Sequence, residues 1–221
     1  MSLGRPRLHL RETTSTNDRA RALAVAGAPH GTLVTAGAQT AGRGRQGRTW
    51  TAPPGSSLLL SLVLRELDPL LSLRAGLAVA DLAGPGARVK WPNDVLLDGR
   101  KVAGILAEGR PQEGWAVLGI GVNAAVEPGE LVAGAGTLGR ARGELEAALV
   151  ELLLALERRL REPAEACVTA LGERDALLGQ PVTWVGGSGM GAGIDTSGAL
   201  RIRLDDGGET MLDAGEVHLG R

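Results

Sequence analysis

The chain has 221 residues, 43% of them hydrophobic, and a formal net charge of −1 at pH 7. This length permits one large domain, or one domain with a small second one. The balanced charge excludes a global attraction to nucleic acid or to an anionic membrane surface, so any anion-binding site has to be local. No apolar run reaches the length of a membrane span, and we expect a cytoplasmic protein.

Cysteine and histidine are too few and too dispersed to suggest redox or metal chemistry. The single cysteine, Cys167, excludes an intramolecular disulfide and is expected to be a small buried hydrophobe. The three histidines, His9, His30 and His218, show no ligand spacing. We therefore predict no metal site built from His and Cys.

The first part of the chain alternates between short strands and helices. Strands are predicted over residues 8–11, 32–36 and 57–64, the last as a continuous apolar run that is typical of a buried strand. Helices are predicted over residues 18–26 and 69–83, the second beginning at a proline.

A β-hairpin is the clearest feature of the middle of the chain. Asp98-Gly99, followed by Arg100, separates the apolar segments 95–97 and 101–107, and Asp-Gly between two such segments is a strong hairpin signal. The pairing brings Asp94 and Lys101 near each other on adjacent strands.

The rest of the chain predicts one more strand, two helices and a change of composition. The strand covers residues 115–123, and the helices cover 143–161 and 163–176. From residue 179, short apolar runs alternate with Gly- and Asp-rich turns, which indicates a small β-barrel-like domain. The fold class is therefore α+β, with a central mixed or antiparallel sheet and flanking helices, divided into domains 1–177 and 178–221.

Residues 42–50, which we call the arginine loop, read GRGRQGRTW. Glycines let backbone N–H groups approach an anion closely, and arginines carry forked donors that match carboxylate and phosphate. With little apolar surface to bury, the loop is predicted to become ordered over an anionic ligand. Its glycines match a dinucleotide-binding spacing, but Pro53 and Pro54 follow in place of a helix, which argues against a Rossmann fold.

Two other polar clusters flank this loop in the sequence. Ser15, Thr16 and Asn17 precede the first helix. Composition favours a helix cap there, although a row of short donors and acceptors facing a ligand is compatible with it. The second cluster, around the hairpin, combines two lysines, an amide and two carboxylates: Lys90, Asn93, Asp94, Lys101 and Glu108.

Taken together and in this order, the motifs resemble the biotin–protein ligases, or biotin–[acetyl-CoA-carboxylase] ligases. They are Ser15-Thr16-Asn17, QTAGRGRQGRTW ending at Trp50, KWPND beginning at Lys90, KVAG beginning at Lys101 and GIGVN ending at Asn123. Residues 193–200 are also similar to the family's C-terminal domain. The resemblance implies a biotin–lipoate ligase fold, related to class II aminoacyl-tRNA synthetases, followed by a small SH3-like β-barrel.

The resemblance also implies the reaction. The family joins biotin to ATP, releases pyrophosphate, and transfers biotin from biotinyl-5′-AMP to one lysine of a biotin carboxyl carrier protein domain. Because two anions have to meet, Lys and Arg with Mg²⁺ would offset their repulsion, and a lid would keep water from the mixed anhydride. Mg²⁺ would arrive on ATP.

Roles for individual residues follow from the same resemblance. Biotin would be bound by Ser15, Thr16, Asn17, Gln39, Gly42, Arg43, Arg45, Lys101, Gly104 and Leu106. ATP would be bound by Arg43, Arg45, Arg48, Trp50, Lys90, Asn93, Lys101 and Asn123. Lys101 is the expected main catalytic residue, with Arg43 on the anionic groups and Asp94 orienting Lys101 or the acceptor lysine.

Alternatives from other classes stay open at this point. Lipoate–protein ligases and octanoyltransferases have a related fold and a carboxylate ligand, and an RNA-binding module could use Arg43, Arg45 and Arg48. The first catalytic strand begins within about ten residues of Met1, so we predict no DNA-binding domain and no operator binding. A homodimer or a monomer is expected.

Overall fold

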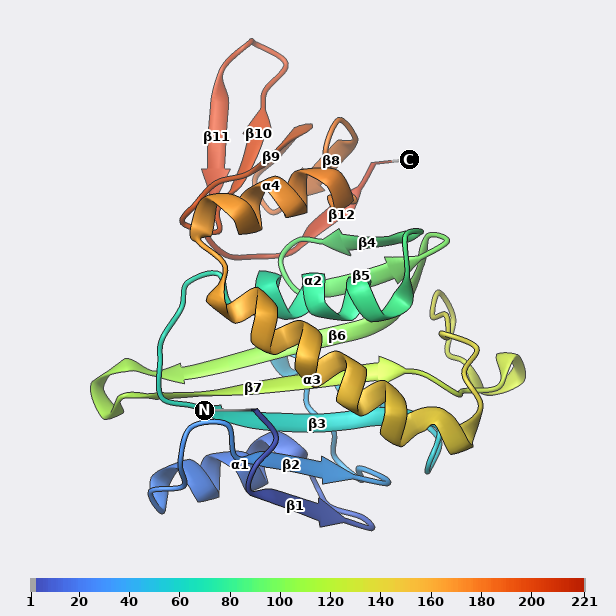
Figure 1. Ribbon diagram of the computed structural model, residues 1–221. Coiled ribbons are helices and arrows are strands. Elements are labelled where there is room, and N and C mark those ends of the chain that lie inside the picture. The colour runs from blue at the N-terminus through green and yellow to red at the C-terminus, as the bar shows by residue number, and fades with distance from the viewer. Residues whose placement is uncertain (1–2, 221) are drawn as a thin grey trace.

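The computed structural model describes residues 3–220, which contain two sheets and four α-helices (Figure 1). Seven strands form the larger sheet in the order β1-β2-β3-β7-β6-β5-β4. Only β1 and β2 are parallel, and the other neighbours are antiparallel. The strands are β1 (Arg7–Leu10), β2 (Leu33–Ala36), β3 (Ser57–Leu64), β4 (Ala87–Lys90), β5 (Asp94–Leu97), β6 (Arg100–Arg110) and β7 (Trp115–Asn123).

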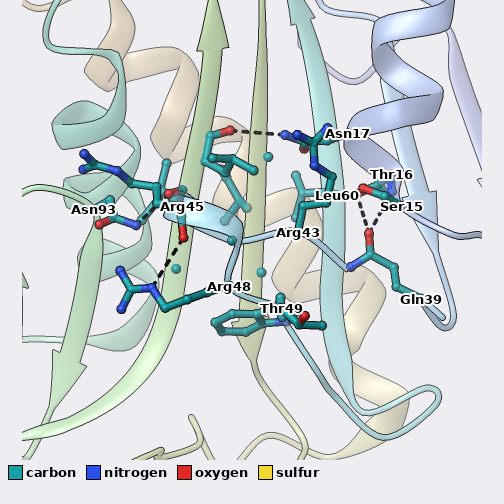
Figure 2. A pocket seen from close by; sticks show the side chains of 18 of the residues that line it. Ser15, Thr16, Asn17, Gln39, Arg43, Arg45, Arg48, Thr49, Leu60 and Asn93 are labelled. Atoms are coloured by element: carbon teal, nitrogen blue, oxygen red, sulfur yellow. Dashed lines mark hydrogen bonds between the residues drawn. The ribbon is translucent and has the colours of Figure 1, made fainter. Parts of the chain in front are cut away.

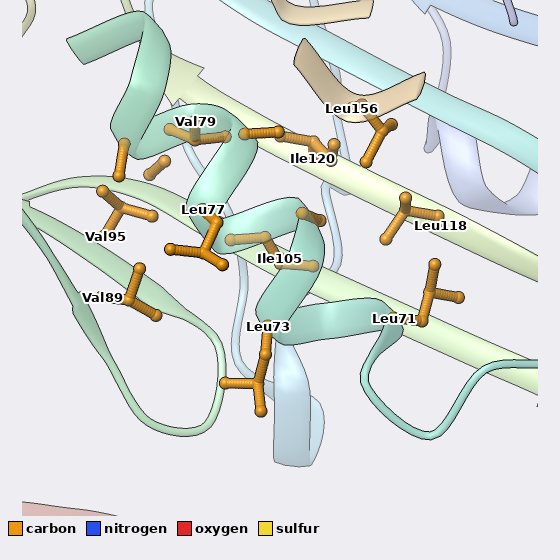
Figure 3. Packing of buried hydrophobic residues seen from close by; sticks show 14 of the residues in the cluster. Leu71, Leu73, Leu77, Val79, Val89, Val95, Ile105, Leu118, Ile120 and Leu156 are labelled. Atoms are coloured by element: carbon orange, nitrogen blue, oxygen red, sulfur yellow. The ribbon is translucent and has the colours of Figure 1, made fainter. Parts of the chain in front are cut away.

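Helices cover the two faces of this sheet unequally. Helices α2 (Leu71–Ala83) and α3 (Leu145–Arg161) lie over one face, where leucines of α2 pack against apolar residues of β6 and β7 such as Ile105 and Ile120 (Figure 3). Helix α1 (Thr16–Val25) lies on a second, smaller apolar cluster with Val63 and Val117. Burying each large aliphatic side chain contributes about 1.5–3 kcal/mol, so the α2–α3 side supplies most of the core.

The hairpin of β5 and β6 contains one surplus residue. Its turn is Asp98-Gly99, both with positive φ, as an Asp-Gly hairpin turn requires. Val95 pairs with Ala103 and Leu96 pairs with Lys101, so Val102 forms a β-bulge. Val102 and Ala103 are both buried in the core.

The C-terminal sheet has five antiparallel strands in the order β11-β10-β9-β8-β12. They are β8 (Pro181–Trp184), β9 (Gly187–Ile194), β10 (Leu200–Arg203), β11 (Glu209–Leu212) and β12 (Val217–Leu219), and α4 (Ala164–Arg174) leads into them. Its apolar side chains, Leu200 and Ile202 among them, belong to the same core cluster as α2 and α3. Trp91 Nε1 also donates to the carbonyl of Gly198 at 2.9 Å, so the two sheets are packed together.

These elements confirm the predicted α+β class, with its mixed sheet, flanking helices and small C-terminal β unit. The predicted boundary between residues 177 and 178 stays a prediction, because Leu177 and the C-terminal sheet share one core. Within residues 3–220, no helix is both long enough and apolar enough to span a bilayer.

Candidate functional site

A cavity of about 120 Å³ lies between the large sheet, the start of α1 and the arginine loop (Figure 2). Backbone and side chains from β3, β6 and β7 form its floor. Its lining includes Ser15, Thr16, Asn17, Gln39, Arg43, Arg45, Arg48, Trp50, Asn93, Lys101, Gly104 and Leu106. All of these except Leu106 come from four of the five motifs, which are far apart in the sequence, and the fold brings them to one place.

The arginine loop is folded by its own backbone hydrogen bonds. Gly44 N donates to Arg48 O at 2.7 Å, and Trp50 N donates to Gly42 O at 2.9 Å. A Cβ on Gly42 would lie 2.4 Å from the Trp50 carbonyl oxygen, so only glycine fits there. Gly42 is therefore needed to close the loop, and it lies outside the cavity lining.

Trp50 lies across the glycines of the floor. A Cβ on Gly121 would come within 2.6 Å of its ring, and a Cβ on Gly104 within 3.1 Å. The Lys101 ammonium lies 5.9 Å from the ring centroid. The indole Nε1 is buried and has no hydrogen-bond partner within the described residues, which is costly for a buried donor. The indole and the glycines form a narrow slot beside a cation.

The three arginines of the loop have different partners. Arg43 pairs with Asp18 at 2.8 Å and with Glu108 at 3.2 Å, which holds the start of the loop against α1 and β6. Arg48 pairs at 2.5 Å with Glu216, the residue before β12 of the C-terminal sheet. Among residues 3–220 the Arg45 guanidinium forms no ion pair, and it lines the cavity. Arg45 is thus the loop cation most available to an anionic ligand.

The bulge at Val102 decides where Lys101 lies. Lys101 and Gly104 are three residues apart, and a regular strand would place them on opposite faces. Because the bulge adds one residue, both lie on the pocket face, and Lys101 Nζ is 2.7 Å from an Asp94 carboxylate oxygen. The predicted proximity of these two side chains is confirmed.

Residues 10–124, just over half of the chain, match the Biotin/lipoate A/B protein ligase family. Two relatives are named biotin–[acetyl-CoA-carboxylase] ligase. The one from Paracoccus denitrificans is 38% identical, covering 96% of this chain and 99% of the relative. The one from Mycobacterium tuberculosis is also 38% identical, with 93% of this chain and 86% of the relative covered. This protein belongs to the biotin/lipoate protein ligase family.

A solved structure of a family member supports the same assignment. Biotin protein ligase from Aquifex aeolicus, in complex with biotin and ATP, is 28% identical and superposes with a TM-score of 0.79. The match covers 98% of this chain and 99% of that one. The predicted biotin–lipoate ligase fold is therefore confirmed.

The helix-cap interpretation of the first family motif needs a correction. Ser15 occupies the N-cap position of α1 with extended backbone, but its side chain makes no capping hydrogen bond. Instead, Gln39 Oε1 accepts a hydrogen bond from Thr16 N at 2.7 Å. A residue from the segment after β2 thus satisfies this end of α1, which leaves the Ser15 side chain at the cavity.

The other predicted residues divide into those at the cavity and those behind it. Asn93 lines the cavity and donates to the carbonyl of Ile105 at 2.9 Å. Asn123 is buried and donates to the carbonyl of Gly136 at 3.1 Å. Neither Asn123 nor Lys90 lines this cavity, and their contacts with ATP stay predictions.

Sequence reasoning missed two residues that support the site. Ser61 lies fully buried in an apolar run and contacts Thr16 and Asn17. Glu108 was noted in the hairpin cluster without a role, and it accepts hydrogen bonds from Asn17 and Arg21. The available signal for Ser61 was a serine in the middle of the run SLLLSLVL, between apolar residues on both sides.

Proposed function

We propose that this protein is a biotin–protein ligase that forms biotinyl-5′-AMP from biotin and ATP and then transfers biotin to a lysine of a carboxylase carrier domain. One observation carries the proposal for the site. The cavity has a neutral polar end, with Thr16 and Gln39, and a cationic side, with Arg45 and Lys101. Biotin has the matching halves, a neutral ureido ring and a carboxylate.

In the first step a carboxylate oxygen of biotin bonds to the α-phosphorus, and the bond from that phosphorus to the pyrophosphate oxygen breaks. Both reactants are anionic, and negative charge builds up on the phosphate oxygens. Lys101 and Arg45 would offset this charge from fixed positions. Asp94, 2.7 Å from Lys101 Nζ, would hold the ammonium in place. Arg43 would act mainly by holding the loop, through Asp18 and Glu108.

Ligand binding would require the arginine loop or Trp50 to move. A cavity of about 120 Å³ is smaller than the roughly 300–1,000 Å³ of typical small-molecule sites. The Trp50 indole lies directly against the glycine floor and its Nε1 has no partner among the described residues, so a shift of the ring would both open space and let Nε1 form a hydrogen bond. A closed loop would then keep water from the acyl-adenylate.

Mg²⁺ would be brought by ATP. In the described part of the chain, no three His, Cys, Asp or Glu side chains gather into a metal-binding group. Mg²⁺ is commonly held by substrate phosphates with few protein carboxylates, which agrees with this arrangement.

The partners and location follow from the proposed activity. The acceptor would be a biotin carrier domain in the same compartment, the cytoplasm. A homodimer or a monomer is the expected oligomeric state.

The test is incubation with biotin, Mg-ATP and a carrier domain, followed by the mass of the carrier. We expect the carrier to gain one biotinyl group, only when ATP is present. Parallel samples with lipoate or octanoate in place of biotin test whether the protein transfers one of these acyl groups instead. Transfer of lipoate or octanoate instead of biotin would overturn the proposal.

A further inference from the structure

A chain of four polar side chains leads from outside the cavity to its neutral end. Glu108 Oε2 accepts from Asn17 Nδ2 at 2.9 Å. Asn17 Oδ1 lies 2.6 Å from Ser61 Oγ, and Ser61 Oγ lies 2.8 Å from Thr16 Oγ1. Thr16, Asn17 and Ser61 are all buried, and only Thr16 and Asn17 line the cavity.

The Glu108 carboxylate determines which group donates in the hydrogen bonds from Asn17 to Glu108 and from Ser61 to Asn17. A carboxylate only accepts, and Arg21 and Arg43 also point donors at it, at 2.7 and 3.2 Å. The Asn17 amide therefore has to turn its NH₂ group to Glu108 and its oxygen to Ser61. That oxygen can only accept, so Ser61 donates its single hydroxyl hydrogen to Asn17.

The donor and acceptor roles at Asn17 and Ser61 then fix the role of the Thr16 hydroxyl. Because Ser61 donates its only hydroxyl hydrogen to Asn17, its oxygen can only accept a further hydrogen bond. Thr16 therefore has to donate to Ser61 across the 2.8 Å contact. The competing choice, donation from Thr16 to Gln39 Oε1 at 3.1 Å, would leave the shorter contact without a hydrogen. Gln39 Oε1 already accepts from Thr16 N at 2.7 Å. The lone pairs of Thr16 Oγ1 are left for a ligand.

Gln39 presents the complementary group. Because its Oε1 is held by Thr16 N, its Nε2 is the free end, and Figure 2 shows that nitrogen turned toward the cavity. The neutral end of the cavity therefore offers one fixed acceptor and one fixed donor. A ring with adjacent N–H and C=O groups matches this pair.

We propose that Ser61 and Glu108 are positioning residues that, through Asn17, fix Thr16 Oγ1 as the acceptor for an N–H group of the substrate ring. They thereby determine specificity for a cyclic urea over a ring without N–H groups, such as a dithiolane. This inference rests on the proposed biotin ligase function. Asn17, predicted to contact biotin, acts here mainly by relaying the orientation, since both ends of its amide are already used.

The test compares biotin with two derivatives, each methylated on one of the two ureido nitrogens. Dissociation constants are measured by calorimetry on the full chain. We expect at least one derivative to bind the wild type about tenfold or more weakly than biotin, because a buried acceptor loses its donor. In Ser61→Ala, biotin should bind about tenfold more weakly, and the preference for biotin over that derivative should shrink to within about threefold.

Ser57→Ala is the matched control. Ser57 is a buried serine on the same strand, its hydroxyl has no partner within residues 3–220, and it lies outside the cavity lining. This variant should keep the wild-type preference. The KM for ATP should stay within about twofold in both variants, which a general loss of structure would not allow.

Glu108→Gln provides a second variant in case Ser61→Ala folds poorly. An amide at position 108 can donate to Asn17 as well as accept from it, so the Asn17 side-chain amide can flip. Its NH₂ group would then donate to Ser61, Ser61 could donate to Thr16, and Thr16 could turn its hydroxyl hydrogen toward the ligand. The preference for biotin should again shrink. An undiminished preference in the folded variants would overturn the inference while leaving the biotin ligase function intact. Failure of the wild type to bind biotin at all would overturn the proposed function as well.

Discussion

The ammonium of Lys101 and the carboxylate of Asp94 lie 2.7 Å apart on adjacent strands of one hairpin. Lys101 also faces the indole of Trp50 and lines the cavity. Lys101→Ala removes a preorganised cation, and we expect adenylation to fall at least ~10²-fold. Pyrophosphate release with biotin and Mg-ATP measures this. Near-normal release would refute the catalytic assignment.

Asp94→Asn separates the two roles expected for the carboxylate. If Asp94 mainly orients Lys101, the variant should slow adenylation about tenfold while its transfer rate from preformed biotinyl-5′-AMP stays near that of the wild type. Single-turnover measurements of each step give the answer. A loss confined to transfer would instead place Asp94 on the acceptor lysine.

Gly121→Ala tests the slot that holds Trp50. The added Cβ would lie 2.6 Å from the indole ring, so the ring has to move. We expect the KM for ATP to rise about tenfold. Gly129→Ala is the control, because a Cβ there meets nothing within 4 Å. Adding Trp50→Ala to Gly121→Ala should cost little more, since both changes disturb one contact.

The ion pair of Arg48 and Glu216 joins the arginine loop to the C-terminal sheet. The Arg48 side chain is 53% exposed and the Glu216 side chain 36%, so the pair contributes at most about 1 kcal/mol. In Glu216→Gln, trypsin should cut the loop up to about fivefold faster, and high salt should remove the difference from the wild type. Glu209→Gln, which breaks an exposed pair with Arg201 inside the C-terminal sheet, should leave loop cleavage unchanged.

Biotinyl-5′-AMP should protect the same loop from trypsin. The loop has little apolar surface of its own, and Arg45 has no anionic partner among residues 3–220 until a ligand supplies one. We expect cleavage after Arg43, Arg45 and Arg48 to slow markedly when the intermediate is bound. Equal cleavage with and without it would contradict the role of the loop as a lid.

Asp175 gives a pH-dependent prediction for stability. Burial raises the pKa of its carboxyl, while hydrogen bonds from the backbone N–H groups of Leu177 and Leu178 oppose this. A raised pKa in the folded state favours folding at acid pH, and the contribution is lost as the pH rises through that pKa. Asp175→Asn should therefore unfold at a higher temperature than the wild type at pH 7.

The advantage of Asp175→Asn should disappear as the pH falls toward about 4, where the unfolded carboxyl also binds its proton. Asp206→Asn is the matched control. Asp206 accepts the same kind of backbone hydrogen bond, from Gly208 N, but is exposed. Thermal unfolding at several pH values measures both variants, and an equal response in the two would contradict the role of burial.

The hydrophobic pattern was sufficient to predict the α+β class, because several elements carried a strong local signal, while the specific fold came from the family resemblance. The apolar run at β3, the leucines of α3 and the Asp-Gly turn each matched one element within a few residues. The arginine loop was also recognised as a local cation site. Its pairing with Asp18, Glu108 and Glu216 was not, because those partners are distant in sequence and depend on how the sheets pack.

The supporting polar residues were the hardest to predict. A serine within an apolar run gives no local sign of what its hydroxyl contacts. Ser61 has partners only because α1 packs against β3. The N-cap motif was misleading for a similar reason. Gln39, far along the chain, takes over the capping bond that local composition assigned to Ser15.

The bulge at Val102 also determines how many side chains β6 contributes to the core. Without Val102 the hairpin would be regular, and Lys101 would still share a face with Gly104, now as its next-but-one neighbour. Their spacing along the strand would be unchanged, because Lys101 already lies opposite Leu96 and Gly104 opposite Asp94, two positions apart on β5. The surplus residue therefore adds a second buried side chain to the core beside Ala103, while the cation and the glycine floor keep the spacing of a regular strand.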